Sequence, residues 1–190
     1  SGKKILFVAT KKQAKKVVAD AAKKLDMPYI TERWPGGLLT NFSTIRKSIK
    51  KMDGIDKMKT DGTFDTLSKR ERLQISRTRE KLEINLGSIV KMNRMPAAIF
   101  IIDINKEHIA LKESAKLGIR SFAVTDTNTN PALVNYPIPG NDDASKSISH
   151  IVEVVTHAIS EGLSERSAEQ DKKALEKQKK AKKISEEAKK

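Results

Sequence analysis

The sequence predicts an α/β fold in which helices cover a parallel sheet. Two stretches carry this prediction, 4–30 and 95–131, because each has the pattern of a strand, a helix and a second strand. The two strands of such a βαβ unit run parallel, and the helix lies across one face of the sheet. In folds of this kind the groups that act on a ligand lie at the carboxyl ends of the strands.

The clearest pattern is in 95–131. Its Ile-rich run 97–102 is typical of a strand buried on both faces. Four apolar residues then recur at roughly helical spacing: Ile109, Ala110, Leu117 and Ile119. Gly118 stands where a left-handed residue commonly caps a helix, and the second strand follows at 121–124. We expect Asp103, at the end of the first strand, to brace the next loop rather than to bind a metal, because no phosphate-binding loop accompanies it.

The stretch 4–30 repeats the pattern near the start of the chain. Strand 4–9 is followed by an amphipathic helix over 11–24, and Pro28 ends that helix before the strand 29–30. The loop Thr10–Gln13 lies at a strand end and a helix start, where free backbone N–H groups favour an anion. The chain contains neither GxGxxG nor GxxxxGK[ST], so nucleotide binding is not predicted.

A long insertion separates the two units. It opens with RWPGGLLTN (33–41), which is predicted to be a shaped loop and a hinge. A basic amphipathic helix is predicted from Phe42, a break at 61–62, and a second helix that Ser68 and Glu71 open as a capping box. We therefore predict an antiparallel helical hairpin over 42–89, inserted into an α/β body formed by 1–41 and 90–162. The body is expected not to depend on the hairpin for its core.

The end of the chain is predicted to be helical but only partly buried. After a short extended segment at 136–140, Asn141 or Asp142 is expected to cap a helix with an apolar stripe from Ile148 to Ile159. The tail 163–190 consists largely of Ala, Glu and Lys, and it is predicted to be either a solvated helix or disordered.

The positive charge is concentrated in the first half of the chain. The formal net charge is +14, and residues 1–94 carry 23 Lys or Arg against 10 Asp or Glu, whereas residues 95–160 carry 5 against 7. Such one-sided repulsion does not stabilise a fold, so the composition indicates a polyanionic partner, of which nucleic acid is the commonest. The lysines of the tail alternate with glutamates and are expected to contribute little.

The candidate RNA-binding residues lie in the first helix, the loop 33–41 and the hairpin: Lys11, Lys12, Lys15, Arg33, Trp34, Asn41, Arg46, Lys47, Lys50, Lys51, Arg70, Arg77 and Arg79. Trp34 has two alternatives, a stacking platform for a base or an anchor for its own loop, and the sequence favours neither. The basic residues of the hairpin are expected to contact phosphates rather than to form only a solvated face.

Catalytic and metal sites are not predicted. The chain has no Cys, which excludes disulfides and thiolate sites, and His108, His150 and His157 lack metal-ligand spacing. No nucleophile elbow, signal peptide or membrane-length apolar run is visible, so we expect a soluble intracellular protein without a cofactor.

Several motifs in the right order resemble one family. They are RWPGGLLTNF (33–42), LSKRERLQ (67–74), PAAIFIIDINKEHIALKESAKLGI (96–119), TDTNTNP (125–131) and YPIPGNDDA (136–144). Together they resemble ribosomal protein S-two of the small subunit, in its bacterial type. Members of the family normally have further helices and a strand ahead of the position of Lys3, so the resemblance assigns neither that edge of the sheet nor any RNA contacts made there. Arg120 stands where Pro or Ala is usual.

The resemblance implies a three-layer flavodoxin-like domain with a protruding helical hairpin. It also implies a structural, non-enzymatic constituent of the cytoplasmic ribosome that binds small-subunit ribosomal RNA. Its implied protein partners are neighbouring ribosomal proteins, including the mRNA-binding protein S-one, which it helps to dock. The alternatives are an enzyme or sugar-phosphate-binding domain on a flavodoxin-like fold, and a coiled-coil adaptor without RNA contacts.

Overall fold

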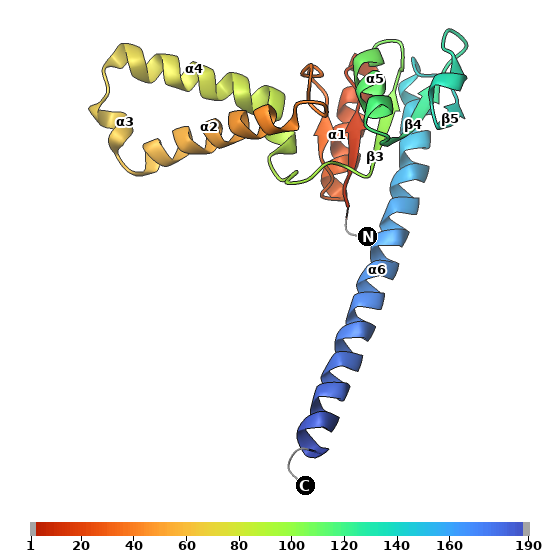
Figure 1. Cartoon of the computed structure of the whole chain (residues 1–190). Coiled ribbons are helices and arrows are strands. Elements are labelled where there is room, and N and C mark those ends of the chain that lie inside the picture. Colours follow the sequence, from red (N-terminus) through yellow and green to blue (C-terminus); the bar gives the residue numbers. More distant parts are fainter. Residues whose placement is uncertain (1–2, 188–190) are drawn as a thin grey trace. The chain divides into compact units, whose positions relative to one another are not determined.

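The fold is taken from a computed structural model, which describes the backbone of residues 3–187 and the side chains of residues 3–169 (Figure 1). Residues 1–152 form one compact unit, and residues 153–190 form another. The strands are β1 (Ile5–Val8), β2 (Tyr29–Ile30), β3 (Ala98–Ile102), β4 (Arg120–Thr125) and β5 (Tyr136–Pro139). The α-helices are α1 (Lys12–Lys24), α2 (Phe42–Thr60), α3 (Thr63–Thr66), α4 (Lys69–Leu86), α5 (His108–Lys116) and α6 (Ser145–Glu187), and the short 3-10 turns are η1 (Gly87–Ile89) and η2 (Pro131–Leu133).

The five strands form one parallel sheet in the order β2-β1-β3-β4-β5. This is the flavodoxin-like strand order, in which the direction of winding changes between β1 and β3. The sequence-based prediction of an α/β fold with a parallel sheet is therefore confirmed. The segment 136–140, expected only to be extended, supplies the edge strand β5 beside β4.

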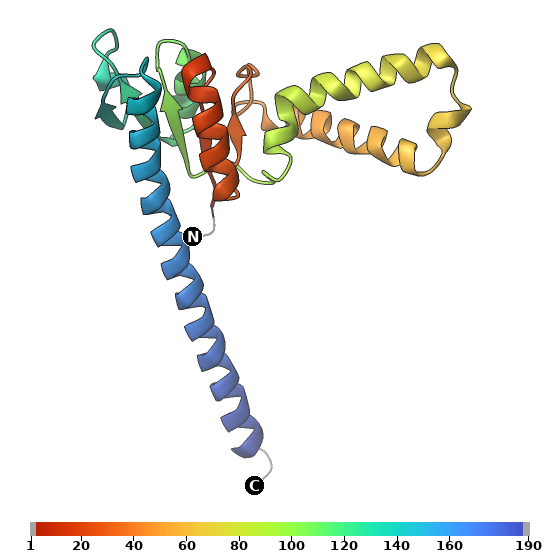
Figure 2. The same cartoon turned by 180° about the vertical axis from the view of Figure 1, so that it is seen from behind.

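Alternating side chains of the central strands enter two different cores. Leu6, Val8, Ile99 and Ile101 lie on the face that also packs against α5 residues. Phe7 and Phe100 lie on the opposite face, with ring centroids 5.5 Å apart. Figures 1 and 2 show α5 on one side of the sheet and α1 on the other. Burial on both faces explains why β3 is apolar at every position.

Several local predictions are confirmed. The Ser68 side chain accepts the N–H of Glu71, and the Glu71 carboxylate accepts the N–H of Ser68, which completes the capping box of α4. Gly118 has φ of +65° just after α5. The expected cap of α6 is not confirmed, because Asn141 accepts the N–H groups of Asp143 and Ala144, which lie in the turn before the helix begins at Ser145.

The base of the hairpin shares its core with the body. Ile49 of α2, Leu86 of α4 and Ile89 of η1 are buried in the same cluster as Leu6 and Ile99 of the sheet. The expectation that the body does not need the hairpin for its core is therefore wrong at this end. Farther along the hairpin, Met52 and Ile55 of α2 are buried.

The tail is described only as backbone beyond residue 169. The helix α6 continues to Glu187, which corresponds to the helical alternative for residues 163–187. Over the described residues, no helix is apolar over a length sufficient to cross a membrane.

Candidate nucleic-acid interface

The hairpin presents exposed cations on both long helices. Lys47, Lys50 and Lys51 of α2 are exposed and lie three and four residues apart, which places them on one face of the helix. On α4, Arg70, Arg77 and Lys81 line a groove of about 450 Å³ together with Gln74 and Thr78. A second groove of about 510 Å³ is also lined by Gln74 and Thr78, and Lys51 contributes to it from α2.

The two grooves adjoin, because they share Gln74 and Thr78. We call them together the hairpin groove, and its cations are Lys51, Arg70, Arg77 and Lys81. The first groove also contains Leu73, whose side chain is 53% exposed. Lys81 was not among the candidate residues, but it lies four positions after Arg77 and therefore on the same face of α4.

Seven of the candidate RNA-binding cations have no hydrogen-bond acceptor or ion-pair partner among the described residues: Lys12, Arg33, Lys47, Lys50, Lys51, Arg70 and Arg77. All seven are exposed. An exposed cation without an internal partner retains its full charge for an external anion. These residues are the part of the candidate set that the geometry favours.

Three other candidate cations are engaged within the chain. Arg79 of α4 binds Asp56 of α2 through Nε at 2.9 Å and through Nη2 at 3.3 Å. Arg46 donates through Nη1 to the carbonyl oxygens of Val90 and Met92, at 3.4 and 3.5 Å. Lys15 pairs with Glu32 at 2.9 Å. These contacts support the hairpin and its junction with the body, so the geometry gives Arg46 and Arg79 a structural role.

Lys11 is also held internally. Its Nζ lies 2.8 Å from Asp142 Oδ1, 2.6 Å from Asp143 Oδ1 and 3.6 Å from Asp103 Oδ2. Burial alone would lower the pKa of Lys11, but the hydrogen bonds to Asp142 and Asp143 outweigh it and raise the pKa above its usual range. Only 16% of the Lys11 side chain is exposed. We therefore remove Lys11 from the proposed RNA-contacting set, where the sequence had placed it.

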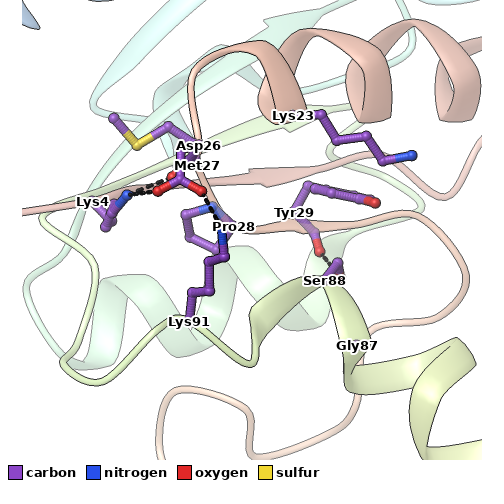
Figure 3. A pocket seen from close by; sticks show the side chains of 9 residues that line it. All are labelled: Lys4, Lys23, Asp26, Met27, Pro28, Tyr29, Gly87, Ser88 and Lys91. Atoms are coloured by element: carbon purple, nitrogen blue, oxygen red, sulfur yellow. Dashed lines mark hydrogen bonds and ion pairs between the residues drawn. The ribbon is translucent and has the colours of Figure 1, made fainter.

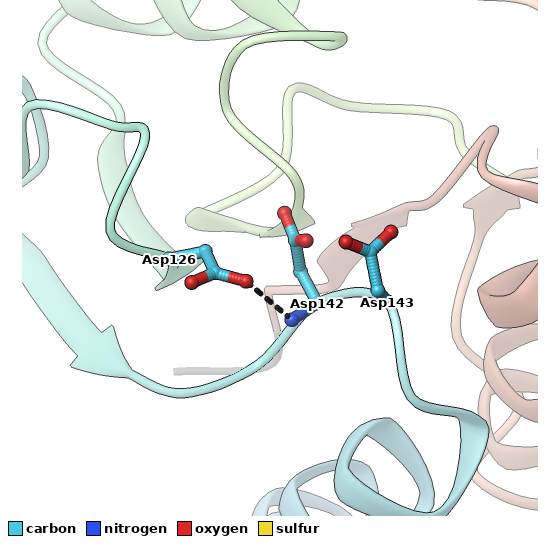
Figure 4. Close-up of side chains that lie close together, drawn as sticks. All are labelled: Asp126, Asp142 and Asp143. Carbon is cyan, nitrogen blue, oxygen red and sulfur yellow. Dashed lines mark hydrogen bonds between the residues drawn. The ribbon is translucent and has the colours of Figure 1, made fainter.

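The acidic side chains near Lys11 form the only metal-like cluster among the described residues. Oxygen atoms of Asp126, Asp142 and Asp143 lie within 4.8 Å of one another, and Asp142 donates its N–H to Asp126 at 3.4 Å (Figure 4). The Lys11 ammonium already provides a cation to Asp142 and Asp143. This arrangement therefore functions as an internal ion-pair network of the body.

The crevice at the switch point between β1 and β3 is bridged by side chains. The buried carboxylate of Glu107 accepts the N–H of Thr10 at 3.1 Å and also the Thr10 hydroxyl. Lys106 donates to the carbonyl oxygen of Thr10 at 3.2 Å. Flavodoxin-like proteins bind their ligands at this point. The sequence offered the loop Thr10–Gln13 as an anion contact, and within this loop the N–H of Thr10 already donates to Glu107.

Trp34 is an anchor for its loop. It is 6% exposed, and its Nε1 donates to Glu113 Oε1 at 3.1 Å. A base cannot stack on a side chain buried in this way, so the geometry favours the second of the two alternatives for Trp34. Asn41, also a candidate for RNA contact, is exposed and accepts the hydroxyl groups of Ser43 and Thr44 at the start of α2.

Glu113 organises the loop 33–41, and sequence reasoning missed it. Besides Trp34, its carboxylate accepts the N–H groups of Gly37 at 2.8 Å, Leu39 at 2.9 Å and Thr40 at 3.2 Å. Burial would raise the pKa of Glu113, but these hydrogen bonds outweigh it and lower the pKa below its usual range. The available signal was a carboxylate on the buried stripe of α5, three residues after Ala110.

Comparison with known proteins decides the family. Residues 1–162 match the sequence profile of the family described as Ribosomal protein S2. The chain belongs to this family. The resemblance inferred from the motifs is therefore confirmed.

Named relatives agree with this assignment. Small ribosomal subunit protein uS2 of Flavobacterium johnsoniae is 66% identical over 176 residues, which cover 93% of this chain and 69% of the relative. The protein of the same name from Christiangramia forsetii is 65% identical, over 89% of this chain and 56% of its own length. That of Cytophaga hutchinsonii is 54% identical, over 99% of this chain and 74% of its own length.

The chain thus spans between about half and three quarters of these relatives. Family membership confirms the prediction of a ribosomal protein that is not an enzyme, and with it the predicted location on the cytoplasmic ribosome.

Proposed function

We propose that this chain is a structural constituent of the small ribosomal subunit that binds ribosomal RNA, with the hairpin as its main electrostatic contact. The single observation that carries the proposal is the set of exposed, internally unpaired cations along α2 and the hairpin groove. Folded RNA is recognised largely through its shape and its phosphates, which dispersed Lys and Arg side chains suit better than a closed pocket does.

The geometry of α4 supports contact with a run of phosphates. Arg70, Arg77 and Lys81 lie on one helix, and the first and last of them are 11 positions apart, which corresponds to about 16 Å along its axis. The cations are presented by helices that the capping box and the Asp56–Arg79 contact already fix. Little conformational freedom of the backbone is therefore lost when they bind.

A salt titration of affinity tests the proposal. Binding of small-subunit ribosomal RNA is measured against KCl concentration for the unmodified chain and for the variant Lys51→Gln, Arg70→Gln, Arg77→Gln, Lys81→Gln. Each phosphate contact removed should reduce the slope of log K against log salt by about one. We expect the variant to bind more weakly and to lose up to about four units of slope.

The matched control removes four exposed cations from the body: Lys24→Gln, Lys112→Gln, Lys116→Gln and Arg120→Gln. This control should retain most of the affinity and most of the slope. If it loses as much as the hairpin variant, the binding surface lies elsewhere on the chain.

The rival function, a sugar-phosphate or nucleotide site on the same fold, is less well supported. Its natural position is the switch point between β1 and β3, where Thr10, Glu107 and Lys11 are already engaged with other residues of the chain.

We also propose, from the family, that the chain helps to dock the mRNA-binding protein S-one. Small subunits reconstituted with and without this chain would be mixed with purified S-one and sedimented. Retention of S-one should depend on the chain; equal retention by both preparations would contradict this part of the proposal.

A further inference from the structure

A small cavity outside the hairpin groove is lined by cationic, aromatic and apolar side chains. It has a volume of about 260 Å³ and lies where the end of α1, the edge strand β2 and η1 meet (Figure 3). The Ser88 hydroxyl donates to the carbonyl oxygen of Tyr29, which fixes η1 against β2. Met27 and Pro28 contribute apolar surface, and the Tyr29 ring is half-buried.

The cavity carries net positive charge. Lys4 and Lys91 both bind Asp26, at 3.0 and 2.8 Å. The hydrogen bond from Lys91, and after it the one from Lys4, lowers the pKa of Asp26 to about 2. One carboxylate therefore serves two ammonium groups. Within the described part of the chain, the third ammonium, Lys23, has neither an acceptor nor an ion-pair partner.

The Lys23 ammonium and the Tyr29 ring are adjacent and form a cation–π contact. The Nζ of Lys23 lies 5.9 Å from the centroid of the Tyr29 ring. Figure 3 shows both on one side of the cavity, across from the Lys4–Asp26 pair. A phosphate at Lys23 would thus have its attached base within reach of an aromatic surface, and base–aromatic stacking is a general means of holding single-stranded nucleic acid.

We propose that this cavity, which we call the Tyr29 pocket, binds one unstacked nucleotide of single-stranded RNA. Its size admits one base and excludes a duplex, so it complements the hairpin groove, to which we assign phosphates of folded RNA. The inference rests on the proposed function in one respect, namely that RNA is the natural partner. The base stacks on Tyr29, and its phosphate pairs with Lys23.

Binding of short labelled RNA to the full chain tests the Tyr29 pocket. The probes are a uridylate hexamer, an adenylate hexamer and a 12-base-pair RNA duplex, and affinity is measured by fluorescence anisotropy. Tyr29→Ala should weaken binding of both hexamers about tenfold or more, because loss of one stacked base costs this much. Tyr29→Phe should bind normally, and duplex binding should be unchanged in both variants.

A neighbouring pair of lysines provides the matched charge control. Lys23→Gln should weaken hexamer binding several-fold, whereas Lys24→Gln, at the next exposed position of α1, should change it less than twofold. Equal effects of the two substitutions would overturn the assignment of the phosphate to Lys23.

Crosslinking of the unmodified chain tests the proposal without relying on the Tyr29→Ala variant, which could fail to fold. A hexamer containing 4-thiouridine should crosslink to the unmodified chain within peptides that contain Lys23 or Tyr29. Crosslinks confined to other peptides would overturn the proposal, as would tight binding of free uridine monophosphate without hexamer crosslinks. If Tyr29→Ala leaves hexamer affinity unchanged while the hairpin substitutions still weaken binding of ribosomal RNA, the proposal for the Tyr29 pocket is contradicted and the proposed function is not.

Discussion

The Glu113 carboxylate on α5 accepts the indole N–H of Trp34, 79 positions away in the sequence, at 3.1 Å. The same carboxylate accepts three backbone N–H groups of the loop that leads into the hairpin. A single side chain of the body therefore holds the segment from which α2 starts. A buried carboxylate is normally costly, and this one is satisfied because every one of these donors points toward it.

We predict that Glu113→Gln destabilises the chain by about 1–3 kcal/mol at pH 7. The substitution replaces one carboxylate oxygen, which accepts N–H groups, by an NH2 group, which is itself a donor and faces the same N–H groups. Urea unfolding followed by circular dichroism measures the change. Glu80→Gln, at an exposed position of α4, should alter the free energy of unfolding by less than about 0.5 kcal/mol. A cost for Glu113→Gln as small as this control would contradict the organising role.

The same substitution should also change the pH dependence of stability. Because the pKa of folded Glu113 lies below its usual value of 4.5, its contribution is fully present above pH 4.5. The contribution is lost as the pH falls through the folded pKa. The difference between the unmodified chain and Glu113→Gln should thus be constant from pH 7 to about 5 and should shrink below 4.5. A difference that grew on acidification would contradict the lowered pKa.

Asp103 illustrates a prediction that sequence reasoning made correctly. It has φ of +68°, and its Oδ1 accepts the N–H groups of Asn105 and Lys106, each at 3.1 Å. Asn tolerates this conformation and retains an acceptor, so Asp103→Asn should cost about 0.5–2 kcal/mol. Asp103→Val should cost more, because a β-branched residue is strained at positive φ. Thermal unfolding of both variants measures the order; equal costs would mean that the turn is not the constraint.

The hairpin should tolerate shortening at its tip but not removal at its base. Replacing residues 57–78 by a short Gly-Ser linker leaves the Asp56–Arg79 contact, whose atoms lie 2.9 Å apart, and should preserve cooperative unfolding. Replacing residues 42–89 removes Ile49, Leu86 and Ile89 from the shared core. This replacement should abolish cooperative unfolding or markedly lower the midpoint temperature of thermal unfolding. Differential scanning calorimetry of both deletions decides between this view and an independent hairpin.

A feature could be predicted from the sequence when the residues that determine it lie close together along the chain. Gly118 after α5, the Ser68–Glu71 capping box and the buried strand β3 are set by residues a few positions apart, and local patterns predicted them. The partners of Trp34, Thr10 and Lys11 lie 79, 97 and 131 positions away. Such contacts cannot be predicted before the order of the strands in the sheet is known. Local sequence patterns therefore placed Lys11 and Trp34 among the RNA contacts.

Lys11 and its neighbour Lys12 provide the sharpest test of that revision. Lys11 serves the buried carboxylate of Asp142, whereas Lys12 is exposed and has no partner among the described residues. Lys11→Gln should cost about 3 kcal/mol, because it leaves Asp142 buried without its cation, and the double change Lys11→Gln, Asp142→Asn should recover much of this loss. Lys12→Gln should leave stability unchanged.

The salt dependence of ribosomal RNA binding should show the opposite pattern. Lys12→Gln should reduce the slope by up to about one unit if Lys12 meets a phosphate, and the Lys11, Asp142 double variant should leave the slope as it is. The double variant is the informative one, because it recovers much of the lost stability and its net charge equals that of the unmodified chain. A reduced slope for this variant with normal stability would return Lys11 to the RNA-binding surface.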